Sequence, residues 1–123
     1  MTNIQGKCHC GENTFSVQLK PEYQFICYCN SCRALNSSGH LCGIMLDESN
    51  LSRSEKTKTY AYEGGSGNSI ILHFCPVCAT HLYAYPTAYE GKVVIRANTL
   101  NEVHFCSQQS LFIESAFPWD NPK

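Results

Sequence analysis

Seven of the nine cysteines in this 123-residue chain lie in three tight clusters. The clusters hold two, three and two cysteines: Cys8 and Cys10; Cys27, Cys29 and Cys32; Cys75 and Cys78. Four thiolates complete a tetrahedral zinc site, whereas three leave one coordination position free for water or substrate. The clusters therefore predict two zinc sites with different roles, one that holds the fold together and one that is open to a ligand.

A disulfide framework is the main alternative, and it requires an oxidising compartment and usually an even number of cysteines. The first seven residues lack the basic and then apolar signature of a signal peptide. No apolar run approaches the roughly 20 residues that span a membrane. We therefore expect a cytoplasmic protein, in which short loops between cysteines favour metal binding because little closure entropy is lost.

Length and charge limit the number of domains and the kinds of partner. A chain of 123 residues fits one domain over residues 1–123, with a core that a structural metal would strengthen. The formal net charge is −1 and the nine Lys and Arg residues are spread singly, so the basic stripe of a nucleic-acid binder is missing. We expect neither nucleic-acid nor membrane partners, and the oligomeric state stays open.

The hydrophobic pattern is mostly of strand type. In residues 14–19, Phe15, Val17 and Leu19 fall on one face of a half-buried strand. Similar short segments, rich in Ile, Val, Tyr or Phe and bounded by Gly, Asn or Pro, cover residues 41–46, 58–62, 69–74, 92–97 and 111–114. Six or more strands predict a mainly β domain, a compact sheet structure stapled by zinc and with little helix.

One short helix is predicted over residues 31–36, with Asn30 or Ser31 as its cap. A helix start lowers the pKa of a thiol through its unpaired amides and dipole, and Arg33 adds a positive charge nearby. Cys32 is therefore expected to be a thiolate. The glycine-rich stretch 63–68 is interpreted as a hairpin connection, although it is flexible enough for a mobile loop.

The first and last cysteine pairs are expected to form one site, the four-cysteine group. Cys8 and Cys10 lie on a turn that ends in Gly11, and the Cys-x2-Cys turn at 75–78 resembles a zinc knuckle, in which backbone amides point at the sulfurs. Such a site joins distant parts of the chain. It is structural, because a saturated metal offers substrate no access.

The remaining cysteines, Cys27, Cys29 and Cys32, are called the triplet below. Water, a substrate, Cys42 or Cys106 could complete a metal site there. Both of these last cysteines have apolar surroundings in sequence, where free cysteine commonly packs as a small hydrophobe.

Several motifs together point to one family. They are Gly6-Lys7-Cys8-His9-Cys10-Gly11 followed by Phe15, then Cys27-Tyr28-Cys29-Asn30-Ser31-Cys32-Arg33, then Phe74-Cys75-Pro76-Val77-Cys78-Ala79-Thr80, and Phe117-Pro118-Trp119. In their order and spacing, these motifs resemble the glutathione-dependent formaldehyde-activating family, which includes centromere protein V. The resemblance covers nearly the whole chain.

This resemblance implies a β-rich fold like that of a Rab-exchange accessory factor. It also implies that the four-cysteine group binds a structural zinc and that the triplet is the catalytic zinc site. The implied activity is that of a carbon–sulfur lyase, which adds glutathione or a similar thiol to formaldehyde or another small aldehyde, or reverses that addition. The implied partners are thus a small thiol and a small aldehyde.

The sequence departs from the family pattern at three places. Ala79 stands in the knuckle where a glycine would most easily adopt a positive φ. The residues after the triplet, 34–39, and the segment 97–101 also differ from the usual family residues. These changes leave all seven ligands in place and bear on the identity of the substrate.

Zinc with three thiolate ligands carries a formal charge of −1 and should favour a fourth sulfur over harder ligands. Arg33 could attract a substrate carboxylate and Tyr28 could shield the site, whereas His40 and His73 are interpreted as structural. Two other classes of protein fit the same cysteines. One is a non-catalytic zinc-binding interaction module, and the other is a redox sensor that forms a disulfide between Cys29 and Cys32.

Overall fold

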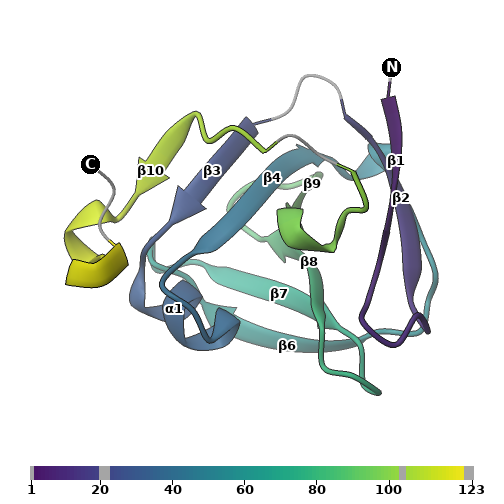
Figure 1. The fold of residues 1–123 in the computed structure, drawn as a ribbon, viewed down its shortest axis with the longest axis horizontal. Helices are drawn as coiled ribbons and strands as arrows, with labels where there is room; N and C mark the ends of the chain where they lie inside the picture. Colours follow the sequence, from purple (N-terminus) through teal and green to yellow (C-terminus); the bar gives the residue numbers. More distant parts are fainter. Residues whose placement is uncertain (1, 20–22, 103–104, 121–123) are drawn as a thin grey trace.

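The computed structural model describes residues 2–19, 23–102 and 105–120. These residues form ten strands, one α-helix and four short 3₁₀ helices. The strands make a three-stranded sheet in the order β1-β2-β5 and a seven-stranded sheet in the order β10-β3-β4-β9-β8-β7-β6 (Figure 1). The fold is mainly β, as predicted from the sequence.

The small sheet contains β1 (Thr2–Lys7), β2 (Thr14–Leu19) and β5 (Leu51–Arg53). The large sheet contains β3 (Tyr23–Cys27), β4 (Leu41–Asp47), β6 (Lys58–Glu63), β7 (Ser69–Phe74), β8 (His81–Pro86), β9 (Lys92–Arg96) and β10 (Gln109–Leu111). The helical elements are α1 (Asn30–Asn36), η1 (Glu48–Asn50), η2 (Ala97–Thr99), η3 (Ile113–Ser115) and η4 (Pro118–Asp120). All strand pairs are antiparallel except β10 with β3, which is parallel.

The main core lies between the two sheets. Phe15 and Val17 on β2 are buried, as their alternation predicts, and pack in one cluster with Leu82 of β8 and Ile95 of β9. The Phe15 ring meets that of Tyr83 edge-on, with 5.6 Å between the centroids. This packing fixes the small sheet against the middle of the large one.

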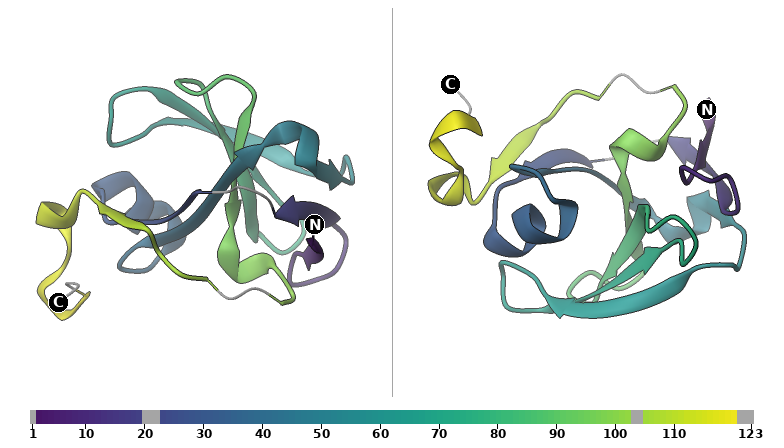
Figure 2. Two further views of the ribbon diagram at one scale, coloured as in Figure 1. Left: turned by 90° about the horizontal axis from the view of Figure 1, so that it is seen from above. Right: turned by 60° about the horizontal axis from the view of Figure 1, so that its bottom comes forward.

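The large sheet curls until its two edges approach each other. β6 and β10 are the edge strands, and Gly65, just after β6, packs against Phe112, just after β10. The hydroxyl of Ser31 in α1 also donates to the carbonyl oxygen of Glu63, over 3.0 Å. The right-hand view of Figure 2 shows the strands curling around α1. The helix that carries part of the triplet therefore sits in the mouth of a nearly closed sheet.

Two predicted strands, 14–19 and 69–74, match β2 and β7 to the residue. The strand predicted at 111–114 is wrong, because β10 ends at Leu111 and Phe112 adopts a left-handed φ of 56° that turns the chain into η3. The pattern also did not reveal β1, β3, β5 or β8. No helix within the described ranges is long and apolar enough to cross a membrane.

Candidate metal centres and active site

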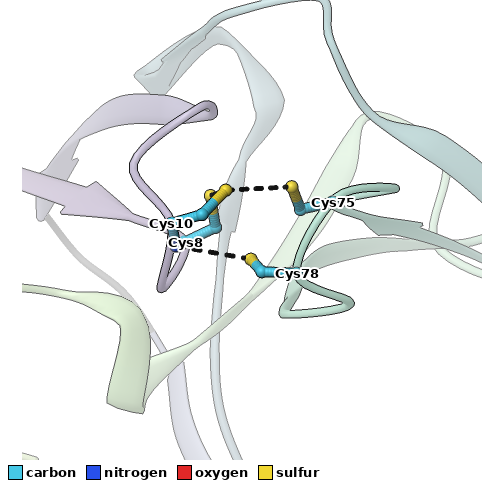
Figure 3. Close-up of side chains that lie close together, drawn as sticks. All are labelled: Cys8, Cys10, Cys75 and Cys78. Carbon is cyan, nitrogen blue, oxygen red and sulfur yellow. Dashed lines mark hydrogen bonds between the residues drawn. The ribbon is translucent and has the colours of Figure 1, made fainter.

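Two turns bring the four-cysteine group together. Cys8 and Cys10 lie on the turn between β1 and β2, and Cys75 and Cys78 lie on the turn between β7 and β8 (Figure 3). The Cys10 sulfur is 3.6 Å from that of Cys8 and 3.7 Å from that of Cys75. Four zinc–sulfur bonds of about 2.3 Å give a tetrahedron with edges of about 3.8 Å, whereas a disulfide bond is about 2.05 Å long. The group therefore fits a tetrahedral metal ion.

Backbone amides surround these sulfurs, as expected of a zinc knuckle. They donate from Asn13 to Cys8 over 3.3 Å, from Val77 to Cys75 over 3.4 Å, and from Cys10 to Cys78 over 3.5 Å. The Thr80 hydroxyl, 3.2 Å from the Cys78 sulfur, and the Cys10 amide lower the pKa of Cys78 to about 5. The pKa of Cys75 is also lowered, whereas burial and the neighbouring sulfurs raise the pKa of Cys10 to about 12. The second turn thus favours thiolates, which are the metal-binding form of cysteine.

Ala79 adopts the positive φ predicted for this turn, at 69°. A left-handed conformation costs an L-residue roughly 1–2 kcal/mol. The backbone N–H of Ala79 donates to the carbonyl oxygen of Cys75 over 2.8 Å, which closes the knuckle around the sulfurs. The substitution of glycine by alanine in this chain therefore leaves the ligand geometry intact.

The second group of sulfurs is buried at the start of α1. Cys27 ends β3, Cys29 caps the helix and Cys32 lies in its first turn, and each is at most 6% exposed. Their sulfur atoms all lie within 4.8 Å of one another. Neither Cys42, half-buried on β4, nor the exposed Cys106 belongs to this group. The described cysteines thus leave a metal at the triplet one ligand short of a tetrahedron.

The helix cap differs from the expected one and changes which cysteine is the thiolate. Cys29, not Asn30 or Ser31, is the N-cap, and its sulfur accepts the backbone N–H of Cys32 over 3.4 Å. Hydrogen bonds from Cys27 and Cys32 lower the pKa of Cys29 to about 2. The same contacts raise the pKa of Cys27 to about 11 and also raise that of Cys32. Without metal, the favoured thiolate is Cys29 and not Cys32, because Cys32 lies inside the helix and donates to Cys29.

The triplet lies at a small cavity of about 130 Å³. Its walls are mostly apolar side chains from β3, β4, β7 and β9, together with Phe112 and the turn between β6 and β7. A cavity of about 150 Å³ accommodates a molecule the size of benzene. The space therefore suits a molecule of a few non-hydrogen atoms, or the reactive end of a larger one.

Arg96 is a cavity residue that the sequence reasoning did not single out. It ends β9, is only 2% exposed, and lines the cavity together with Tyr62 of β6. Its Nε and Nη2 atoms have no hydrogen-bond partner. A signal was available, because the preceding Val93, Val94 and Ile95 form the continuous apolar run typical of a strand buried on both faces. A charge at the end of such a strand is held away from solvent.

The two histidines interpreted as structural have ordinary partners. Nδ1 of His40 lies 2.5 Å from the carboxylate of Asp120, and the His40 ring packs against Tyr28 with 5.4 Å between centroids. Nδ1 of His73 lies 2.9 Å from the Thr57 hydroxyl. None of these residues lines the triplet cavity.

Arg33 faces away from the cavity and into the C-terminal segment. Its guanidinium lies 4.0 Å from the ring centroid of Phe117, which is itself stacked on Trp119. Nη2 of Arg33 also donates to the side-chain oxygen of Asn30. The carboxylate-binding role considered for Arg33 therefore has no support in this arrangement.

The comparisons with known proteins address the fold and the family. The family model described as "Glutathione-dependent formaldehyde-activating enzyme" matches residues 3–115. The chain belongs to this family. A crystal structure of a Rhodobacter sphaeroides protein has a TM-score of 0.61 and 19% identity, over 81% of this chain and 90% of that one. At this identity the likeness shows the fold alone. No curated protein matches the chain significantly.

In this family member, the turn between β6 and β7 packs directly on the triplet. A Cβ atom at Gly65 would lie 2.9 Å from the Cβ of Cys29 and 2.9 Å from the ring of Phe112. Because both neighbours are buried or half-buried, we expect Gly65→Val to displace Cys29 and weaken metal binding at the triplet at least tenfold. Titration with a competing chelator measures this affinity. Ser66→Ala, in the same turn, is the control, and unchanged affinity in Gly65→Val would show that the turn moves aside freely.

Metal binding at the triplet should depend steeply on pH. Near neutral pH the metal-free group holds one thiolate, Cys29, whereas Cys27 and Cys32 keep their protons because their pKa values are raised. Binding through three thiolates must therefore release about two protons, and affinity should fall about a hundredfold for each pH unit lowered. Chelator competition between pH 6 and 8 tests this prediction. The same titration of Cys29→Ser measures the pH dependence of the four-cysteine group alone. A slope near zero would mean that the triplet sulfurs are already ionised.

Proposed function

We propose that the protein is a zinc-dependent carbon–sulfur lyase that joins a small thiol to a small aldehyde, or separates them, at the triplet. The observation that carries this proposal is a buried group of three cysteines at a cavity, with no fourth described cysteine in reach. Family membership supports the same reaction class. In this proposal the four-cysteine group holds a structural zinc, because the protein fills all four positions.

The residues of the triplet suit zinc better than a harder metal ion. Three sulfur ligands select soft or borderline metals, and no carboxylate of the described residues contributes to the group. When bound there, zinc supplies a position for a further sulfur and lowers the pKa of that thiol. Cys27, Cys29 and Cys32 would hold it through β3 and the first turn of α1, so that two rigid elements fix the reacting position.

The reaction needs no oxidant or reductant. The thiol gives up its proton, its sulfur forms a bond to the carbonyl carbon, and the electron pair of the carbonyl π bond moves onto oxygen, which takes up a proton. In the reverse direction the carbon–sulfur bond breaks and the carbonyl re-forms. The apolar walls of the cavity would limit the water around the reacting carbon, which otherwise competes as a nucleophile.

We also propose a single domain over residues 1–123 and a cytoplasmic location. All nine cysteines are free of disulfides in the structure. A reducing compartment would keep the seven cysteines of the two groups as thiols and thiolates, available to metal.

The test is the rate of thiol addition in zinc-loaded protein. Glutathione and ¹³C-formaldehyde are mixed with the protein, and exchange NMR measures the rates at which the hemithioacetal forms and breaks down. These rates are compared with those of the spontaneous reaction without protein. We expect acceleration that requires the metal and disappears in Cys27→Ser. Two zinc ions per chain without acceleration by any small thiol and aldehyde would favour a non-catalytic binding module. Loss of metal with a reversible Cys29–Cys32 disulfide would favour a redox sensor.

A further inference from the structure

Arg96 is a buried cation without a carboxylate partner. The structure describes three ion pairs, His40–Asp120, Lys56–Glu12 and Lys92–Asp47, and none of them includes Arg96. Only 2% of Arg96 is exposed, so solvent does not replace the missing partner. Burial of an uncompensated charge is costly, and buried charges in proteins are normally paired. No described carboxylate compensates Arg96, so its counter-charge comes either from the triplet thiolates, which line the same cavity, or from a bound anion.

The unpaired atoms of Arg96 specify the shape of that anion. Nε and Nη2, the two nitrogens without partners, lie on one edge of the planar guanidinium and carry parallel N–H bonds. This edge matches the two oxygens of a carboxylate, which accepts both hydrogen bonds at once. The triplet sulfurs are weak acceptors and do not offer paired oxygens. A single carbonyl oxygen would pair with both donors less well than a carboxylate does.

The location of Arg96 links it to the proposed reaction. It borders the same cavity as the triplet. The Tyr62 side chain interacts with Arg96 by a hydrogen bond and by charge, and it also interacts electrostatically with Cys32 and Cys29, while Nε and Nη2 of Arg96 stay unpaired. Burial raises the pKa of Tyr62, and the positive charge of Arg96 opposes that rise, so Tyr62 stays a neutral hydrogen-bonding neighbour. Arg96 also borders a more polar depression next to the knuckle, lined by Thr80 and His81. An experiment must therefore distinguish binding in the triplet cavity from binding in this depression.

We propose that Arg96 binds the carboxylate of a small substrate whose reactive atom lies at the triplet. This inference rests on the proposed function and names its substrate class: a thiol or an aldehyde of about five non-hydrogen atoms that carries a carboxylate. The cavity volume of about 130 Å³ accommodates a molecule of that size. The carboxylate takes no part in bond making, so the atom balance of thiol addition is unchanged.

Binding is tested first with two matched thiols and cobalt-loaded protein. Mercaptoacetate carries a carboxylate, whereas 2-mercaptoethanol is a neutral thiol of similar size, and a thiol that joins the triplet changes the cobalt absorption spectrum. Wild type should bind mercaptoacetate at least tenfold more tightly. Arg96→Gln should abolish this preference and change the affinity for 2-mercaptoethanol by less than threefold. Arg96→Lys keeps the charge but lacks the paired donors, and should retain only part of the preference.

The outcomes separate this proposal from the proposed function. A full preference for mercaptoacetate in a folded Arg96→Gln protein overturns the carboxylate role of Arg96, and equal affinities in wild type overturn it for the thiol. Binding of mercaptoacetate seen by calorimetry without a spectral change would place the anion in the depression beside the knuckle, and also overturns it. If neutral thiols change the spectrum in every protein, the proposed function survives these failures.

A second comparison identifies which reactant carries the carboxylate. With zinc-loaded protein, mercaptoacetate plus formaldehyde is compared with 2-mercaptoethanol plus glyoxylate, and each pair is compared with the two neutral reactants. For each charged pair, we compare the rate acceleration with that of the neutral pair, in wild type and in Arg96→Gln. If this ratio falls at least tenfold in the variant, the carboxylate belongs on the charged reactant of that pair. Equal acceleration of the charged and neutral pairs would contradict the proposal.

Discussion

Replacement of Cys75 by serine is expected to leave the chain unfolded and to remove the metal of the four-cysteine group. Cys75 is fully buried, and its group ties the β1–β2 turn to the β7–β8 turn. A serine hydroxyl stays protonated at neutral pH and does not replace a thiolate. A structural zinc contributes about 10–16 kcal/mol in small zinc domains, which matches or exceeds the about 5–15 kcal/mol total stability of a typical fold.

Metal content and near-ultraviolet circular dichroism of purified protein test this expectation. The control is Cys106→Ser, because Cys106 is exposed and lies outside both sulfur groups. It should keep the wild-type metal content and spectrum. If Cys75→Ser stays folded with full metal content, the four-cysteine group does not hold the fold together.

Cys29→Ser is expected to remove the metal of the triplet, lower lyase activity at least a hundredfold, and leave the protein folded. Serine is among the best helix N-caps, so the new hydroxyl can accept the Cys32 N–H in place of the sulfur. The main core between the sheets contains no residue of the triplet. The substitution thus removes a ligand and spares the helix, which separates catalysis from stability.

This prediction is checked by zinc stoichiometry, thermal unfolding and the thiol-addition rate on the same preparation. Cys42→Ser is the matched control, since Cys42 is a half-buried cysteine on β4 outside the triplet. It should keep both metal ions and most of the activity. Full activity and unchanged zinc in Cys29→Ser would mean that the triplet is not the catalytic site.

The sequence predicted the strands whose side chains alternate regularly, such as β2 and β7. It did not predict β3 and β8, which adjoin the cysteine motifs and owe their strand geometry to pairing within the large sheet. β10 was misplaced because the apolar side chains continue past Leu111, although the backbone turns at Phe112. The pattern of apolar side chains predicts which residues are buried, but it does not predict where the backbone adopts a positive φ.

Cysteine spacing predicted which sulfurs lie close within each cluster, because short loops keep them near one another. The counts of two, three and two then predicted that the first and last clusters pair. It did not reveal that Gly65 approaches the triplet or that Arg96 lies beside it, since both come from distant strands. Those contacts depend on the curl of the large sheet. The choice of Cys29 as helix cap was missed for a similar reason, because cysteine is rarely considered among capping residues.

The two sulfur groups differ sharply in how much of the chain must exist before they can form. The triplet is complete within six residues, from Cys27 to Cys32, whereas the four-cysteine group needs Cys8 and Cys78. At a synthesis rate of about 5–20 residues per second, the last ligand of the larger group follows Cys32 by roughly 2–9 seconds. During that interval a nascent chain has all three thiols of the triplet but only Cys8 and Cys10 of the four-cysteine group. Metal bound early by the triplet would be held before the surrounding cavity has formed. In this topology, the triplet can therefore bind metal before the four-cysteine group can hold the fold together.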